Sequence, residues 1–320
     1  MRRITSVALL AVGPLLWGAC ESGLESGTPE LPPGFLDADM PTGDLSGYLF
    51  FSDQPSSKIS LSLLGSSSAT ASATASIWDM SVWFGPNIES FGGIVDFKET
   101  ASAEVAQKAL SSHAGIDAWR ESGAVLFVRG GGEWAANTKA SLQSETSEIF
   151  EEAFPDAWDL MTLMPSDPPA EPVAAGFTST KGGTLDQIAS KTGLDLGGLG
   201  QAFGVINVSQ VAFVAYSDDS INIPARVDRA FLFNSHVGVI MVAESSYPGA
   251  LLSAFLSSFS DQMGLSDGLT IGGEEVLSRE LGGAFLFLKS IESTVFLSLA
   301  PSQSMAQALM ASAIWPYLEE

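Results

Sequence analysis

One serine lies in a spacing that nucleophilic hydrolysis can use. Residues 264–268 read Gly-Leu-Ser-Asp-Gly, a G-x-S-x-G pattern that exposes the serine hydroxyl when it forms a tight turn between a strand and a following helix. Here the pattern follows a predicted helix and leads into residues 269–271, and both histidines, His113 and His236, precede it. We therefore predict that Ser266 belongs to a polar loop that ends a helix. A serine hydrolase stays an alternative.

The chain is poor in residues that hold cofactors. Gly198, Gly200 and Gly204 have a spacing similar to that of a phosphate-binding loop, but the segment before them is predicted to be helical and the strand follows. A dinucleotide site needs the opposite order. Zinc sites draw on several His or Cys ligands, and the chain has two histidines and one cysteine. We predict no cofactor and no metal site.

Carboxylates and tryptophans leave two other chemistries open. Adjacent acidic residues are typical of solvated turns, whereas a glycosidase needs two carboxylates ~5 to 10 Å apart across a cleft; the adjacent pairs are Glu151-Glu152, Asp218-Asp219 and Glu274-Glu275. Tryptophans that could line a carbohydrate or lipid groove, although they more often lie in a core or interface, are Trp78, Trp83, Trp119, Trp134, Trp158 and Trp315. A carboxylate hydrolase and a carrier of an apolar ligand therefore stay alternatives.

The only cysteine, Cys20, ends an N-terminal segment that is typical of export. Two arginines follow the first methionine, an apolar stretch runs over residues 7–17, and a glycine and an alanine directly precede the cysteine. The segment resembles a bacterial lipoprotein signal, which implies that residues 1–19 are removed and that Cys20 is acylated as the first mature residue. About 11 apolar residues are too few to span a hydrocarbon core, which needs ~20. Plain secretion and an uncleaved anchor remain alternatives.

The resemblance implies a place in the bacterial cell envelope, outside the cytoplasm, with the lipid on Cys20 as the contact with the membrane. Which membrane carries the protein stays open. Removal of the signal leaves 12 basic residues against 37 acidic ones. Nucleic acid is excluded as a partner by this balance, because it requires cationic patches. A basic partner, bulk divalent cations or a saline habitat would each fit the acidic excess.

Composition divides the mature chain into a linker and two halves. Residues 20–44 are rich in Gly, Pro and acidic residues, and we predict a lipid anchor followed by a flexible linker because such a segment buries little apolar surface. A proline-rich stretch at 164–172 separates a first half, residues 45–165, from a second half, residues 166–320.

Hydrophobic periodicity predicts an α+β fold with largely antiparallel sheets and helices on one face. Alternation in residues 76–84 places Met80 and Val82 on one face of a strand, and Asp79 and Ser81 on the other. The first half is further predicted to contain a strand at 93–98, a helix at 100–113, a hairpin made from 124–129 and 133–138, and a helix that stops at Pro155. For the second half we predict strands at 208–216, 230–244, 275–280, 284–289 and 294–299, a helix at 246–263 and a last helix that opens at Ser302.

The similar order of elements in the two halves suggests an internal duplication of a strand-strand-helix-hairpin-helix module. No motif points to a defined reaction. The sequence therefore predicts a non-enzymatic, envelope-anchored lipoprotein that acts as a binding or structural module, with a protein or small-molecule ligand that it does not define. A hydrolase, through serine or carboxylates, and a carrier of an apolar ligand are the alternatives.

Overall fold

A computed structural model describes residues 28–38, 40–42, 44–52, 69, 72–73, 76–86, 89–144, 147–179, 206–217, 237–281 and 283–317. The predictions made for Cys20, for the glycines at 198–204, for Asp218-Asp219 and for His236 lie outside these residues.

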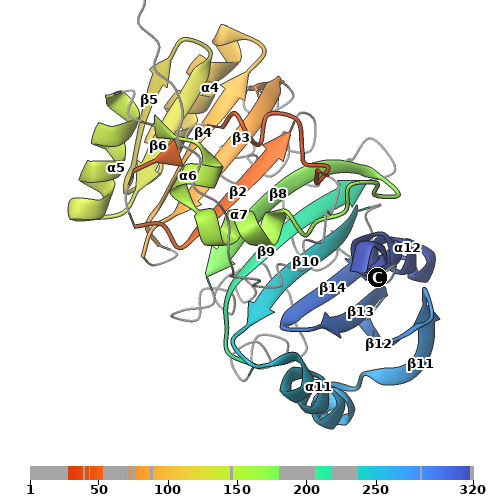
Figure 1. The fold of residues 1–320 in the computed structure, drawn as a ribbon. Coiled ribbons are helices and arrows are strands. Elements are labelled where there is room, and N and C mark those ends of the chain that lie inside the picture. The colour runs from red at the N-terminus through yellow and green to blue at the C-terminus, as the bar shows by residue number, and fades with distance from the viewer. Residues whose placement is uncertain are drawn as a thin grey trace, which may run out of the picture.

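The described residues form one antiparallel sheet of twelve strands, which runs through both halves of the chain (Figure 1). Its strand order is β11-β12-β13-β14-β10-β9-β8-β2-β3-β4-β6-β5. The strands are β2 (Gly47–Ser52), β3 (Ile77–Phe84), β4 (Phe91–Phe97), β5 (Ile116–Glu121), β6 (Ala124–Arg129), β8 (Glu171–Ser179), β9 (Val208–Ser217), β10 (Val237–Ser245), β11 (Ser266–Ile271), β12 (Glu274–Leu281), β13 (Ala284–Ile291) and β14 (Thr294–Ala300). A separate pair joins β1 (Met40–Pro41) to β7 (Ser147–Glu148).

Side chains that alternate along the strands enter different cores on the two faces of the sheet. On β2, Tyr48 and Phe50 belong to one core and Leu49 and Phe51 pack against another. The first core is covered by α6 (Phe150–Ala153), α7 (Pro155–Met161) and α12 (Gln303–Ile314). The opposite face is covered by α4 (Thr100–Ser111) in the first half and α11 (Gly249–Met263) in the second. We call these the α12 face and the α4 face.

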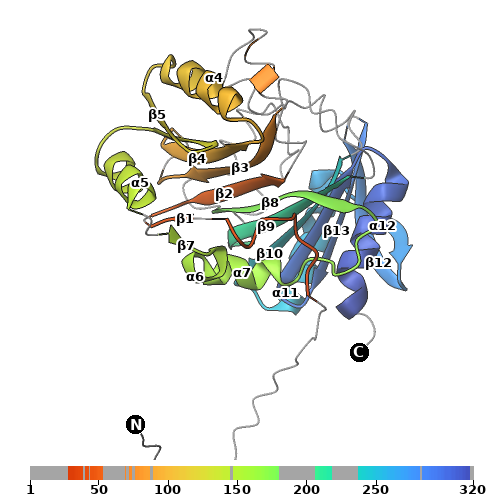
Figure 2. The ribbon, with the colours of Figure 1, turned by 90° about the horizontal axis from the view of Figure 1, so that it is seen from above.

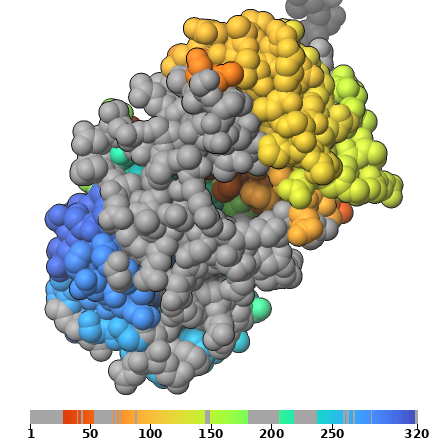
Figure 3. Space-filling model, turned by 180° about the vertical axis from the view of Figure 1, so that it is seen from behind, coloured from red at the N-terminus to blue at the C-terminus, as the bar shows by residue number. Residues whose placement is uncertain are grey.

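The mixed α+β class and the antiparallel sheet are as predicted, but helices on one face only are not. Figure 2 shows α4 on one side of the first-half strands and α6 and α7 on the other. Figure 3 shows the molecule from behind, with α4 at the top and residues of the C-terminal half at the lower left. The strands are apolar on both faces, so each face needs its own cover.

The two halves place their elements in a similar order, apart from β7, α6 and α7 at the end of the first half and the hairpin β11-β12 in the second. The first half runs β2, β3, β4, α4, β5, β6 and then α5 (Glu133–Gln143). The second runs β8, β9, β10, α11, the added hairpin β11-β12, then β13, β14 and α12. In both, the late hairpin pairs beside the third strand, which gives the orders β2-β3-β4-β6-β5 and β8-β9-β10-β14-β13. The halves meet where β2 pairs antiparallel with β8.

Several predicted elements are confirmed, and two are wrong. The last helix begins as expected, with the Ser302 hydroxyl accepting a hydrogen bond from the Met305 amide at 3.2 Å. Residues 133–138 open helix α5 instead of forming a strand, and the hairpin is β5-β6. Gly132, with φ at 79°, lets the chain leave β6 and enter the helix. The second wrong prediction is a helix that stops at Pro155: α6 ends at Ala153, and Pro155 begins α7. Proline fits the first turn of a helix, where a backbone amide needs no helical partner.

Residues 28–44 also differ from the prediction of a flexible linker. Phe35 and Met40 are fully buried, and the Glu30 amide donates a hydrogen bond to the Pro165 carbonyl at 3.0 Å. The Phe35 ring lies 4.9 Å from the Phe150 ring, centroid to centroid. Composition averaged over the segment hides two large apolar side chains that anchor it in the core. The described packing begins eight residues after Cys20.

Where the two halves meet, β8 has no room for a side chain at position 176. A methyl group on Gly176 would lie 2.1 Å from the Tyr48 carbonyl oxygen of β2. Gly176→Ala should therefore force the central strands apart and lower the free energy of unfolding by about 2 kcal/mol, in the range of overpacked cores. Gly131→Ala, where nothing lies within 4 Å, is the control and should change it by less than ~0.5 kcal/mol. Equal effects of the two substitutions in urea unfolding would contradict this account.

Two buried phenols predict a loss of stability in alkali. Burial raises the pKa of Tyr317 to about 12, and burial together with the Glu30 charge raises the pKa of Tyr216. The folded chain therefore keeps phenol protons that the unfolded chain loses near pH 10, so stability should be intact below pH 10 and fall as the pH rises toward 12. Urea unfolding at pH 9 to ~12 should show this fall, weakened in Tyr317→Phe. If the free energy of unfolding fell just as steeply with pH in the double variant Tyr216→Phe/Tyr317→Phe, the loss of stability would be due to other ionisable groups.

Candidate functional site

Ser266 does not stand in a catalytic arrangement. As predicted, its motif follows a helix, since α11 ends at Met263, but Ser266 is the first residue of strand β11 and not part of a loop. Its hydroxyl donates a hydrogen bond to the Ser278 carbonyl on β12 at 3.3 Å. His113 is exposed and follows α4, which packs on β5 at the opposite edge of the sheet. The described residues thus place no histidine beside Ser266.

The adjacent carboxylates that the structure describes lie in a helix turn and in an ion pair between strands. Glu151 and Glu152 lie exposed in the first turn of α6, where a helix favours negative charge. Glu274 pairs with Lys289 across neighbouring strands at 2.7 Å. The tryptophans are equally dispersed: Trp83 is fully buried, whereas about half of the Trp78 and Trp315 side chains is exposed. None of the six tryptophans considered from the sequence lines either of the two hollows described below.

A cavity of about 590 Å³ lies instead between α5 and the α12 face of the first half. Its floor comes from β2, β3, β4 and β6, and its other walls from α5, the end of β5 and the loop at 34–38. Its lining residues are Gly34, Asp37, Ala38, Phe50, Asp79, Ser81, Ile94, Asp96, Glu121, Ala124, Leu126, Ser141 and Leu142. We call this space the first-half cavity.

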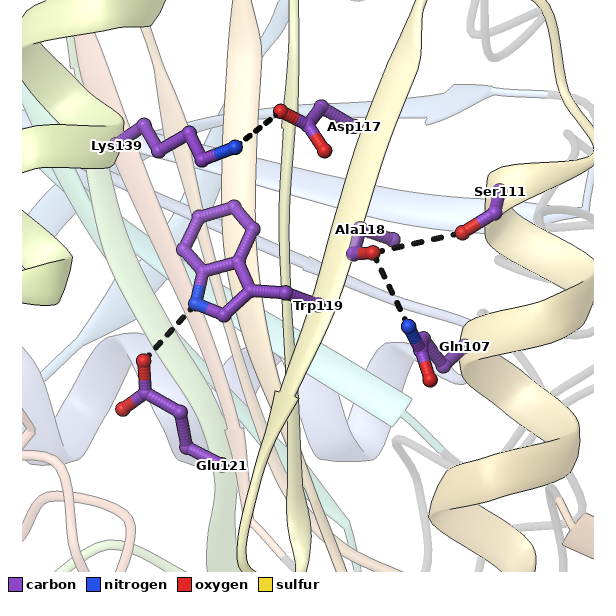
Figure 4. Close-up of polar contacts among 7 residues, drawn as sticks. All are labelled: Gln107, Ser111, Asp117, Ala118, Trp119, Glu121 and Lys139. Atoms are coloured by element: carbon purple, nitrogen blue, oxygen red, sulfur yellow. Dashed lines mark hydrogen bonds and ion pairs between the residues drawn. The ribbon is translucent and has the colours of Figure 1, made fainter.

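Helix α5 is held over this cavity by polar contacts more than by an apolar face. Figure 4 shows Lys139 of α5 reaching the Asp117 carboxylate of β5, with its amine 5.3 Å from the centre of the Trp119 ring. The Trp119 indole nitrogen donates to Glu121 at 2.9 Å. On the other face of β5, side chains of α4 donate to the Ala118 carbonyl (Figure 4).

Two further hydrogen bonds tie α5 to the segment before β2. The Ser141 hydroxyl accepts from the Thr42 amide at 3.0 Å, and the Trp134 indole donates to the Asp44 carbonyl at 3.1 Å. The buried residues of α5 are Thr138 and Ser141, both polar. A helix with so little apolar surface cannot fill the space beneath it, and the cavity follows.

The second half shows the same helix position with the space filled. There α12 buries Leu309 and Met310, among others, against β10 and β14. Packing is so close that a methyl group on Gly238 would lie 2.3 Å from Leu309 Cδ1. The second strand of each half repeats the contrast. In β9, Ala212 and Val214 enter the core.

In β3 the corresponding side chains, Asp79 and Ser81, line the first-half cavity. The alternation in this strand predicted which residues share a face, but not that both faces are covered. Ser81 is buried, 7% exposed, and its hydroxyl lies 3.2 Å from that of Tyr48. In the sequence, the available indication was the alternation that places Asp79 and Ser81 together on one face of the predicted strand. No sequence pattern indicated that Asp37, Asp96 and Glu121, from three other segments, line the same cavity.

A second, shallower hollow of about 550 Å³ lies at the turn between β6 and α5. Arg129 and Glu89, with opposite charges, both line it. The Arg129 guanidinium also stacks 5.6 Å from the centre of the Phe91 ring. This hollow is therefore less selective in charge than the first-half cavity.

Within the described part of the chain, no three His, Cys, Asp or Glu residues are grouped so that they could hold a metal ion. The same part contains no helix whose length and hydropathy suit a membrane crossing.

Comparison with known proteins gives a structural likeness without a family. No protein-family model matches the chain, and no curated protein matches it in sequence. Among solved structures, crystal form III of TP0453 aligns with a TM-score of 0.43 and 7% identity, over 87% of this chain and 98% of that one. Crystal form I of TP0453 gives 0.41 and 5%, over 90% and 99%. Likeness of this degree transfers no residue roles.

Proposed function

We propose that this chain is a non-enzymatic bacterial lipoprotein, anchored in the cell envelope through an acylated Cys20, whose folded part binds a ligand in the first-half cavity. Support for the anchor comes from the basic, apolar and small-residue order that ends at Cys20. Support for binding comes from one contrast: α12 seals the second half, while α5 leaves an open space over the equivalent strands of the first.

The contrast has weight because we also propose that the halves arose by duplication of one module. The order of three strands, helix, hairpin and helix in each half supports this origin, as does the antiparallel contact of β2 with β8 at the centre. An apolar helix that seals its sheet is the stable solution for such a module. The half that departs from it, with polar side chains such as Asp79 facing inward, is the half we assign to binding.

The tether is short in this proposal. Thr28, the first described residue, is eight positions after Cys20, and an extended chain of that length reaches at most ~28 Å. The folded part therefore stays close to the bilayer. It cannot extend away on a linker that reaches residue 44, because Phe35 and Met40, within that segment, are buried in the core.

The alternatives differ in what supports them. A carrier of an apolar ligand draws on Phe50, Ile94, Leu126 and Leu142 in the cavity lining, but these share it with carboxylates. A serine hydrolase has less support, since the Ser266 hydroxyl is bonded to a backbone carbonyl. Binding without covalent chemistry uses the groups that the cavity provides.

The anchor predicts a change of location. Cys20→Ser removes the thiol that would be acylated. When bacterial cells that produce this variant are fractionated, the protein should therefore move from the membrane fraction to the soluble extracytoplasmic fraction. Ser26→Ala, six residues further on, should leave it in the membrane fraction. Membrane association that survives Cys20→Ser would contradict acylation at this position.

The cavity predicts ligand-dependent stability that a single substitution removes. A ligand that binds the folded chain stabilises it, by ~2.7 kcal/mol at a hundred times its dissociation constant. Thermal unfolding of the full mature chain in non-ionic detergent, against a panel of small cations, neutral molecules and anions, should reveal such a shift. Ala124→Phe, which places a ring in the cavity, should abolish it.

The matched control for that substitution is Thr294→Phe. Thr294 opens β14 as Ala124 opens β6, but it does not line the first-half cavity. This variant should keep the ligand-induced shift. A shift that survives Ala124→Phe would place binding elsewhere, and the absence of any shift across the panel would overturn the proposed function.

A further inference from the structure

The charged residues that the structure describes in the lining of the first-half cavity are all acidic. Four carboxylates contribute to it from four separate parts of the fold: Asp37 from the loop before β1, Asp79 from β3, Asp96 from β4 and Glu121 from β5. Among the described residues that line the cavity there is no Lys, Arg or His. Asp79 and Asp96 each have another partner, and Glu121 accepts from Trp119, so the selectivity rests on the sign of the lining as a whole. A cavity lined by one sign of charge concentrates ligands of the opposite sign.

The carboxylates are spread and do not converge on one point. In the described residues no three acidic side chains are close enough to hold one metal ion. A compact cation would therefore meet too few ligands, since calcium takes six to eight oxygens. An elongated cation, with its charges separated, can meet carboxylates on different walls.

Between the carboxylates the lining is apolar. Phe50, Ile94 and Leu126 project from the strands, and Leu142 projects from α5. These side chains offer a surface for methylene groups, which are stabilised when they leave water for an apolar surface. The volume of about 590 Å³ is within the range of small-molecule sites.

We infer that the first-half cavity binds a linear organic diamine or polyamine, with its ammonium groups at the carboxylates and its methylene chain against the apolar lining. This inference rests on the proposed function, because it names the ligand of the same site. It also gives a local use for part of the acidic excess of the chain. A dicarboxylate of the same length would meet repulsion, and a diol would lack the ionic contacts.

The test compares three molecules of equal length: 1,6-diaminohexane, 1,6-hexanediol and adipate. Calorimetric titration uses the full mature chain in non-ionic detergent at physiological ionic strength, which screens the general surface charge beyond ~8 Å. We expect saturable binding of the diamine to one site, and binding of the diol and adipate at least roughly tenfold weaker, because charge-assisted contacts are lost or reversed.

Variants locate the contacts. Asp79→Asn, at a half-buried position, should weaken the diamine roughly tenfold, and Glu121→Gln, at an exposed one, roughly threefold, because solvent screens exposed pairs. Glu133→Gln removes an exposed carboxylate from α5 outside the lining and should leave affinity unchanged. Circular dichroism identifies any variant that fails to fold; if Asp79→Asn does, Glu121→Gln carries the test.

The outcomes separate this inference from the function on which it rests. If Ala124→Phe abolishes diamine binding and Glu133→Gln retains it, the result supports both the cavity as the binding site and the diamine as its class of ligand. Binding of the diol or adipate in preference to the diamine, abolished by Ala124→Phe, overturns the cationic ligand and keeps the cavity as a binding site. Diamine binding that Glu133→Gln weakens as much as Asp79→Asn shows general attraction to an acidic surface and overturns the inference.

Discussion

The structure depends on a sheet that is buried on both faces and continuous through the middle of the chain. Continuity requires β2 and β8 to pair at normal spacing, and Gly176 makes this possible because any side chain there would meet the Tyr48 carbonyl. Tyr48 and Phe177, on either side of that pairing, are both fully or almost fully buried on the α12 face. Every other element covers or extends this sheet, so the composition of each covering helix decides what its region can do.

The two helices that follow the hairpins show this dependence. Helix α12 carries Ala306, Leu309 and Met310 on its buried side, and the strands below it are closed to solvent. Helix α5 buries only two polar side chains and is tied to the fold through Lys139, Trp134 and Ser141. Replacing an apolar stripe by hydrogen bonds removes little net stability when each donor finds an acceptor. The cavity is therefore compatible with a stable first half.

Sequence patterns predicted the parts of this architecture that depend on local periodicity. The strand at 76–84, the helix after residue 100 and the cap at Ser302 all follow from spacing within one segment. The cavity could not be predicted in this way, because its carboxylates come from four segments that only the sheet order brings together. The burial of Phe35 could not be predicted for a related reason: its ring packs against Phe150, more than a hundred residues away.

The segment that joins the proposed anchor to the fold is also part of the cavity wall. Gly34, Asp37 and Ala38 line the cavity, and Thr28, the first described residue, is only six residues before Gly34. An acyl chain on Cys20 would thus hold Thr28 within ~28 Å of the bilayer. The cavity wall begins six residues further along the chain, at Gly34. Anionic lipid headgroups attract cations to the solution next to the membrane, and this attraction falls off within a Debye length of the surface. A cavity selective for cations, tethered this close, would sample a solution enriched in its own ligand.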